Sequence, residues 1–271
     1  MLRFLQKYFE EQKVRGWVAR FGHIMTGLGV FCLVLARRYV LQINRHCTDE
    51  RSDVFVPQKR ILHQKVNAVL ARQRRDYASY MYFYGQPYQS LGILDIFGER
   101  PSEERFDIYG LKDIVTKEDT ILDIGCNCGF MGIITAYRTG CRVEGIDINP
   151  YMIEIGQLCA DYLRLSDRVS LKAQRFQEYS GAGKFSVVFS FATHWTDDEN
   201  YRVDLVEHLS KIHSFLQPGG TLVFESHAAD VGVPEFYASL ERVRHLFSWD
   251  GIHCNVDSDT RELYIMKRLP I

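Results

Sequence analysis

Short apolar runs alternate with longer helix-like segments through the second half of the chain, and this alternation limits the possible folds most. The helix-like segments after Asp119 are 10–17 residues long. Parallel strands need crossovers of this length, because a tight turn joins only antiparallel neighbours. Two further strand-like runs around a turn at 257–260 predict a hairpin at the edge of the sheet. The sequence therefore predicts an α/β fold: a doubly wound, mostly parallel seven-stranded sheet of the Rossmann-like type. The expected strands are 120–125, 141–149, 169–174, 185–192 and 219–226, and the expected helices are 130–140, 151–165, 200–216 and 235–247.

The first 80 residues differ in character from this alternating part. Apolar residues recur with a period near 3.6 in residues 2–21 and again in residues 57–83, which predicts helices. We therefore expect a basic helical extension over 1–80 and a second domain over 81–271. Within that domain, residues 81–118 form a lead-in rich in aromatic residues, Gly and Pro, and residues 119–271 form the core sheet. Pro101 followed by Ser-Glu-Glu predicts a short helix over 102–110.

The charge is distributed unevenly along the chain. The formal net charge is −1, yet residues 1–75 carry 15 Lys/Arg against 5 Asp/Glu. This excess predicts a contact with anionic lipid or with nucleic acid, and the interleaved Leu and Val favour lipid. In the segment 23–43, the uninterrupted apolar core is 13 residues long, short of the roughly 20 that span a bilayer. Two interpretations stand: a buried helix of the extension, or a segment lying on a membrane surface.

The seven cysteines show no repeating spacing. An odd number without a framework is typical of reduced thiols, so we expect a cytoplasmic protein with possible association at a membrane. A zinc site needs a second pair of Cys or His ligands, which the sequence lacks, and we therefore expect no metal.

An acidic residue and two glycines mark the turn between the first strand and the first helix of the core. In an open α/β sheet, ligands bind beyond the carboxyl ends of the strands at such a turn. Gly125 permits a tight bend and close approach to a ligand, and Gly129 lets the helix start pack nearby, with Cys126 and Asn127 between them. Asp123 disfavours a pyrophosphate on the helix N-terminus but favours the sulfonium and α-ammonium groups of S-adenosylmethionine. We expect that cofactor here.

A second acid supports the same ligand. Asp147 ends the second strand, 22 residues after Gly125, where it is placed to accept both ribose hydroxyls, and Ile148 follows it at the same edge. A dinucleotide fingerprint needs glycines at i, i+2 and i+5, but those positions from Gly125 hold Asn127 and Phe130. The spacing therefore disfavours a dinucleotide.

These motifs carry a resemblance to a known family. "LDIGCNCGF" together with "GIDIN" resembles motifs I and II of the class I S-adenosylmethionine-dependent methyltransferases, and the likeness covers about residues 85–271. Asn127 departs from the Gly of many members, but Asn tolerates unusual backbone angles. The upstream "YGQPYQSLGILDIFGERPSEERFDIYGL" resembles the lead-in of a subgroup that includes the methyltransferase part of bacterial O-antigen chain-terminating enzymes.

The subgroup resemblance implies further residues that hold the cofactor. It implies Tyr88, Gln89 and Arg100, with Arg100 on the methionine carboxylate. The alternative for Arg100 is a salt bridge to Glu103 or Glu104.

The family resemblance also implies that residues after the third strand border the adenine. Their counterparts here are Gln174, Arg175 and Phe176. For Phe176, an ordinary core position is the alternative.

Two histidines follow the fourth and fifth strands, where the family places the acceptor. We expect His194 to act as a general base, with Glu225 and His227 orienting it or sharing that task. The alternatives are a hydrogen-bonded loop histidine and a Glu225 paired with Lys or Arg. The Pro-Pro-aromatic motif of amino-methylating enzymes is absent after the fourth strand. The sequence therefore predicts methylation of a hydroxyl or phosphate on a glycan or small molecule. An RNA-modifying methyltransferase and a non-catalytic S-adenosylmethionine-binding protein are the alternatives.

Overall fold

The computed structural model describes residues 55–76, 86–195, 204–256 and 260–270. Residues 57–271 belong to one compact unit. The helix expected over 2–21 and the apolar segment 23–43 lie outside the described residues. In the ranges that are described, no helix combines the length and the hydropathy that a membrane span requires.

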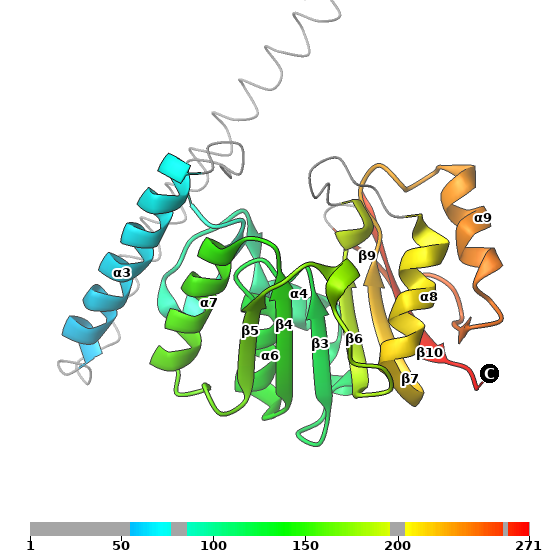
Figure 1. The fold of residues 1–271 in the computed structure, drawn as a ribbon, viewed down its shortest axis with the longest axis horizontal. Coiled ribbons are helices and arrows are strands. Elements are labelled where there is room, and N and C mark those ends of the chain that lie inside the picture. The colour runs from blue at the N-terminus through cyan, green and yellow to red at the C-terminus, as the bar shows by residue number, and fades with distance from the viewer. Residues whose placement is uncertain (1–54, 77–85, 196–203, 257–259, 271) are drawn as a thin grey trace, which may run out of the picture. The chain divides into compact units, whose positions relative to one another are not determined.

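A mixed sheet forms the centre of the compact unit (Figure 1). The strand order is β5-β4-β3-β6-β7-β10-β8, and β9 also pairs with β10. The five strands from β5 to β7 pair in parallel, whereas β10 runs antiparallel to its neighbours. This order confirms the doubly wound, mostly parallel fold with a hairpin at the C-terminal edge. The strands are β3 (Thr120–Ile124), β4 (Arg142–Asp147), β5 (Val169–Ala173), β6 (Phe185–Phe191), β7 (Leu216–Glu225), β8 (Phe247–Ser248), β9 (Cys254–Val256) and β10 (Arg261–Arg268).

In the part of the chain that the structure describes, the sheet has one strand more than the seven that the sequence predicts. The additional strand is β8, whose two residues pair with Lys267 and Arg268 of β10. Two residues are too few to show a period of two, and the sequence analysis placed Phe247 at the end of a helix.

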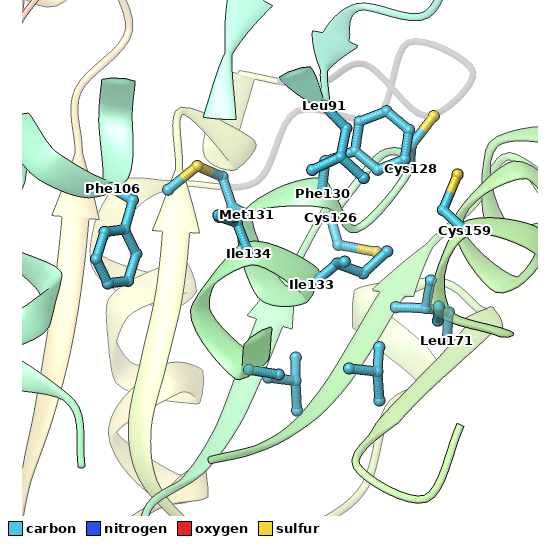
Figure 2. Close-up of a cluster of buried hydrophobic side chains, with 14 of the residues drawn as sticks. Leu91, Phe106, Cys126, Cys128, Phe130, Met131, Ile133, Ile134, Cys159 and Leu171 are labelled. Atoms are coloured by element: carbon cyan, nitrogen blue, oxygen red, sulfur yellow. The ribbon is translucent and has the colours of Figure 1, made fainter. Parts of the chain in front are cut away.

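Helices cover both faces of the sheet, as a doubly wound fold requires. Leu122 and Ile124 of β3 face a core cluster shared with α8 and α9, whereas Ile121 faces a second cluster shared with α3 to α7. Figure 2 shows part of this second cluster, with Phe106 and Leu171 on opposite sides of α6. The helices are α3 (Phe55–Asp76), α4 (Ser102–Ile108), α5 (Leu111–Ile114), α6 (Phe130–Thr139), α7 (Pro150–Tyr162), α8 (Leu205–Phe215) and α9 (Pro234–Arg242).

Helix α3 belongs to the compact unit and contacts it along much of its length. Four apolar side chains of α3, Leu62, Val66, Val69 and Leu70, are buried in the second cluster. Lys59 pairs with Asp95 at 2.5 Å, and Arg72 pairs with Glu154 at 2.5 Å. The domain division at residue 80 and the contact of residues 1–75 with anionic lipid stay predictions, since 1–54 and 77–85 lie outside the described residues.

Candidate functional site

The turn between β3 and α6 is built from backbone in the left-handed region. Gly125, Asn127 and Gly129 have φ of 60°, 55° and 67°. A Cβ atom on Gly125 would lie 2.5 Å from Thr193 Cγ2, and one on Gly129 would lie 2.7 Å from Leu171 Cδ2. Both positions therefore require glycine for two reasons: the φ angle is left-handed, and a side chain lies where a Cβ atom would be.

Asp123 lies beneath this turn with an unsatisfied oxygen. Its side chain is 2% exposed, and Oδ2 has no hydrogen-bond partner among the described residues. Burial raises the pKa of this carboxyl to about 7, and nearby Asp147 adds to the rise, while the Arg105 guanidinium and the Gly132 amide oppose it. A buried carboxyl without a full set of partners is stabilised in its ionised form by a cationic ligand.

Asp147 connects the turn after β3 with the turn after β4. Its Oδ2 accepts a hydrogen bond from the Asn127 amide at 2.8 Å, and its Oδ1 accepts one from the Asn149 amide at 2.9 Å. The Asn149 side chain in turn caps α7 through the amides of Tyr151 and Met152. A carboxylate acts only as an acceptor, which is the chemistry that a ligand hydroxyl requires. Ile148, half-buried, follows it.

The lead-in segment reaches the same turn. Strand β1 (Gln89–Ser90) pairs in parallel with β2 (Arg100–Pro101). Gln89 Oε1 accepts a hydrogen bond from the Phe130 amide at 3.0 Å, which satisfies an otherwise unpaired N–H at the start of α6. The Arg100 amide donates to the Tyr88 carbonyl at 2.9 Å. Leu91 packs beside Phe130 (Figure 2). The structure thus brings Gln89 to the start of α6, while Tyr88, its neighbour in the chain, contacts Arg100.

Glu225, at the end of β7, lies in a buried arginine cluster. It accepts from Arg100 at 2.8 Å, from Arg105 and Arg261 at 3.0 Å each, and from the Tyr109 hydroxyl. Although burial acts in the other direction, Arg105, Arg100 and the Tyr109 hydroxyl lower its pKa to about 2. The sequence left open a pairing of Glu225 with Lys or Arg, and pairing with arginine is observed. None of these contacts involves His194.

His194 has a different carboxylate partner. Its Nε2 lies 2.9 Å from Asp230 Oδ2, and both side chains are buried. The same Asp230 oxygen accepts from the His227 amide at 2.7 Å, which fixes the carboxylate. His194 Nδ1 is buried and has no hydrogen-bond partner among the described residues. With Nε2–H donating to Asp230, Nδ1 carries the lone pair of a base. His227 Nδ1 accepts from the Ala229 amide at 3.1 Å.

A polar network of Ser190, Thr193 and His208 lies next to His194, whose ring centroid is 6.1 Å from that of His208. Ser190 Oγ lies 2.8 Å from Thr193 Oγ1 and 3.0 Å from His208 Nε2. Burial lowers the pKa of His208 to about 3, so this ring is neutral. Thr193 starts the short 3-10 helix Thr193–Trp195 and is also the residue packed against Gly125. Thr193 therefore lies between His194, the next residue in the chain, and the glycine turn.

The region after β5 lies partly in the core. Phe176 packs against His208, with ring centroids 4.9 Å apart, and against Phe215 at 5.9 Å. Arg175 precedes it at the start of the 3-10 helix Phe176–Glu178, and the Gln174 amide donates to the Asp147 carbonyl at 2.9 Å. Cys126 is buried, and burial raises the pKa of its thiol.

Several residues of the site escaped the sequence analysis: Arg105, Tyr109, His208 and Asp230. Arg105 and Tyr109 lie four residues apart in α4 and the following turn, a spacing that places them on one helix face. That spacing can be recognised in the sequence, but it does not indicate which residue the two side chains contact. Asp230 stands three residues after His227, in a loop that gives no periodic signal.

Comparisons with known proteins agree with this architecture. Residues 115–263, more than half of the chain, match the model of a methyltransferase domain family. A geranyl diphosphate 2-C-methyltransferase from Streptomyces ambofaciens is 28% identical over 109 residues, which are 40% of this chain and 36% of that protein. A sterol 24-C-methyltransferase from Eremothecium gossypii is 31% identical over 113 residues, covering 39% of this chain and 27% of that protein. The matched part thus spans about a third of the length of these relatives.

A solved structure shares the fold. A geranyl diphosphate methyltransferase in complex with GPP and sinefungin superposes with a TM-score of 0.50 and 14% identity, covering 78% of this chain and 99% of that one. The family match and the glycine turn with its buried acid lead to one conclusion. The chain belongs to the methyltransferase domain family, and this domain is of the S-adenosylmethionine-dependent class.

Proposed function

We propose that the protein methylates a hydroxyl oxygen of a small molecule or glycan, and that His194 accepts the proton released. The observation that carries this proposal is the His194–Asp230 pair at the carboxyl end of β6, with a buried Nδ1 that has no partner in the described chain. A histidine oriented by a carboxylate is the arrangement that activates a hydroxyl in many enzymes.

The cofactor supplies an electrophilic methyl group on a sulfonium. In our proposal Asp123 faces its positive charge, and the carboxylate of Asp147 accepts hydrogen bonds from the ribose. Arg100 holds the methionine carboxylate from the lead-in, and Arg175 and Phe176 border the adenine. The remaining residues around the turn shape the pocket by their backbone or packing: Tyr88, Gln89, Gly125, Cys126, Asn127, Gly129 and Ile148.

The path of the proton follows from the positions of His194 and Asp230 beyond the carboxyl end of β6, where we place the acceptor. The acceptor O–H donates to His194 Nδ1, its oxygen forms a bond to the methyl carbon, and the sulfur–carbon bond breaks. The proton stays on the imidazole, whose positive charge is stabilised by Asp230. Orientation supplies most of the rate enhancement in such a displacement. Glu225, with a pKa of about 2, is a poor base, and in this proposal it organises the arginine cluster instead.

A carbon acceptor is the second candidate, because both curated relatives described above are named as C-methyltransferases. Addition of a methyl group to a carbon–carbon double bond leaves a carbocation, which must lose a proton to a base. His194 serves that step equally well. An isoprenoid or sterol would be the corresponding small-molecule class. Membership of the O-antigen subgroup and an RNA acceptor stay predictions from the sequence.

One labelling experiment separates the two candidates. The full-length protein is incubated with carbon-13 methyl S-adenosylmethionine and with lipid, glycan, RNA and small-molecule fractions of a cell extract. The chemical shift of the new methyl carbon then distinguishes O–CH₃ from C–CH₃. An O–CH₃ signal in the glycan or small-molecule fraction is expected. A C–CH₃ signal establishes the second candidate, and label in RNA alone contradicts both.

A further inference from the structure

We propose that Arg105 is a positioning residue for cofactor binding: held by Glu225 and Tyr109, its guanidinium keeps the buried Asp123 carboxyl in the ionised form that a cationic ligand requires. This inference rests on the proposed role of Asp123 as the carboxylate that faces the cofactor. Arg105 belongs to neither sequence motif of the cofactor site.

The sheet places the two carboxylates on one face. Asp123 of β3 pairs with Phe189 of β6, and Phe191 of β6 pairs with Glu225 of β7. Paired residues on neighbouring strands point to the same side, as do residues two apart on one strand. The Phe189 and Phe191 rings are 5.2 Å apart. Asp123 and Glu225 therefore project from the same face, with these two aromatic rings between them.

Arg105 of α4 lies over this face. Its guanidinium carbon is 5.1 Å from the centre of the Phe191 ring, its Nη2 donates to Glu225 at 3.0 Å, and its Nε donates to the Tyr109 hydroxyl at 2.9 Å. The side chain is 4% exposed. Two hydrogen bonds and the ring stack leave the guanidinium little freedom, so its charge stands at a fixed place near Asp123.

The groups around Asp123 act in opposing directions. Arg105 on α4 and the Gly132 amide on α6 favour the carboxylate, whereas Asp147 on β4 and burial favour the neutral acid. Burial and the charge of the Asp123 carboxyl both raise the pKa of the Cys126 thiol, so this thiol stays neutral. Of these groups around Asp123 in the described part of the chain, Arg105 is the one that carries a full positive charge. Loss of that charge raises the pKa of Asp123 further, so that protonation competes with the cofactor at higher pH.

The test measures S-adenosylmethionine affinity of the full-length protein by calorimetry across a range of pH. The readout is the ratio of wild-type to variant affinity at each pH, which cancels the titration of the ligand itself. For Arg105→Gln we expect a ratio of about ten near pH 6.5 that falls below about two near pH 8.5, if the pKa of Asp123 rises by about one unit. Arg105→Lys keeps the charge and should remain much closer to wild type.

A matched control comes from the same helix interface. Arg138 of α6 pairs with Asp107 of α4 at 2.6 Å and lies over the Phe106 ring, away from Asp123. Arg138→Gln should change affinity by a factor that does not vary with pH. Thermal melts establish that each variant is folded.

Three outcomes are distinguishable. A pH-dependent ratio for Arg105→Gln supports the inference. A ratio that is the same at every pH overturns it, because a purely structural role would act in this way. If Asp123→Asn itself leaves affinity unchanged, the proposed cofactor role of Asp123 fails, and this inference fails with it.

Discussion

At the carboxyl ends of β3 and β4, which we call the cofactor edge, the site combines a backbone turn with the carboxylates of Asp123 and Asp147. At the ends of β6 and β7, which we call the acceptor edge, it is made of side chains, among them His194 and Glu225. At the ends of β3 and β4, the Asn127 amide and Asp147 meet across 20 residues. At the ends of β6 and β7 the contacts join more distant residues: Arg100 and Arg105 contact Glu225 across 125 and 120 residues, and His194 meets Asp230 across 36.

This difference has a physical consequence. A backbone turn with left-handed φ angles is fixed by a few glycines that lie close together in the sequence. A cluster of buried side chains fails when any one partner is removed, because the others keep their charge without compensation. We therefore expect the cofactor edge to vary little among related methyltransferases, and the acceptor edge to determine which molecule is methylated.

The largest expected effect is at the acceptor edge. With an acceptor from the labelling screen, His194→Gln should lower kcat by about 10²–10⁴, the usual contribution of a general base. Asp230→Asn should act in the same direction, because an amide that donates to Nε2 forces the proton onto Nδ1. Both variants should bind S-adenosylmethionine as the wild type does, measured by calorimetry. Undiminished turnover in His194→Gln would remove it from the mechanism.

The next effect probes the cofactor edge. Gly125→Ala combines left-handed strain with a Cβ atom 2.5 Å from Thr193 Cγ2, so we expect a loss of about 3 kcal/mol in the free energy of unfolding. Gly183→Ala is the matched control, since Gly183 has a similar φ of 64° but open space around its Cβ position. It should lose only about 1 kcal/mol.

Urea titrations of both glycine variants measure this difference. Equal losses would mean that the contact between the glycine turn and Thr193 contributes nothing, and that the two edges are not packed together as described.

The pH dependence of stability should differ in sign between the edges. Asp123 has a folded pKa of about 7, above its unfolded value, so the folded state holds the extra proton and stability falls as pH rises towards 7. His208 has a folded pKa of about 3, below its unfolded value, so stability falls as pH drops from 6.5 towards 3. Each slope is at most about 1.4 kcal/mol per pH unit.

Single variants of the folded apo protein separate these slopes. From about pH 4.5 to 6.5, the stability of Asp123→Asn relative to wild type should increase with pH, and that of His208→Asn should decrease. Slopes of the same sign would contradict the assigned environments of one of the two residues.

The two edges also differed in how far the sequence predicted them. The order of strands and the placement of Asp123, Gly125, Gly129 and Asp147 at one edge follow from local patterns, because a motif of a few residues builds that edge. The partner of His194 could not be read in this way: Asp230 lies in a loop, and only the folded chain shows that it, rather than Glu225, meets the imidazole. Strand β8 escaped detection because two residues carry no periodicity.

The most direct test of the central claim compares S-adenosylmethionine binding to the wild type and to Asp123→Asn near pH 8, where the wild-type carboxyl is mostly ionised. Asn has nearly the same shape without the charge. Asp167→Asn, at a side chain that is 73% exposed, serves as the control. The account predicts a loss of affinity of roughly 10- to 100-fold for Asp123→Asn, the range expected for a charged hydrogen bond, and none for the control. Equal affinity in all three proteins would contradict it.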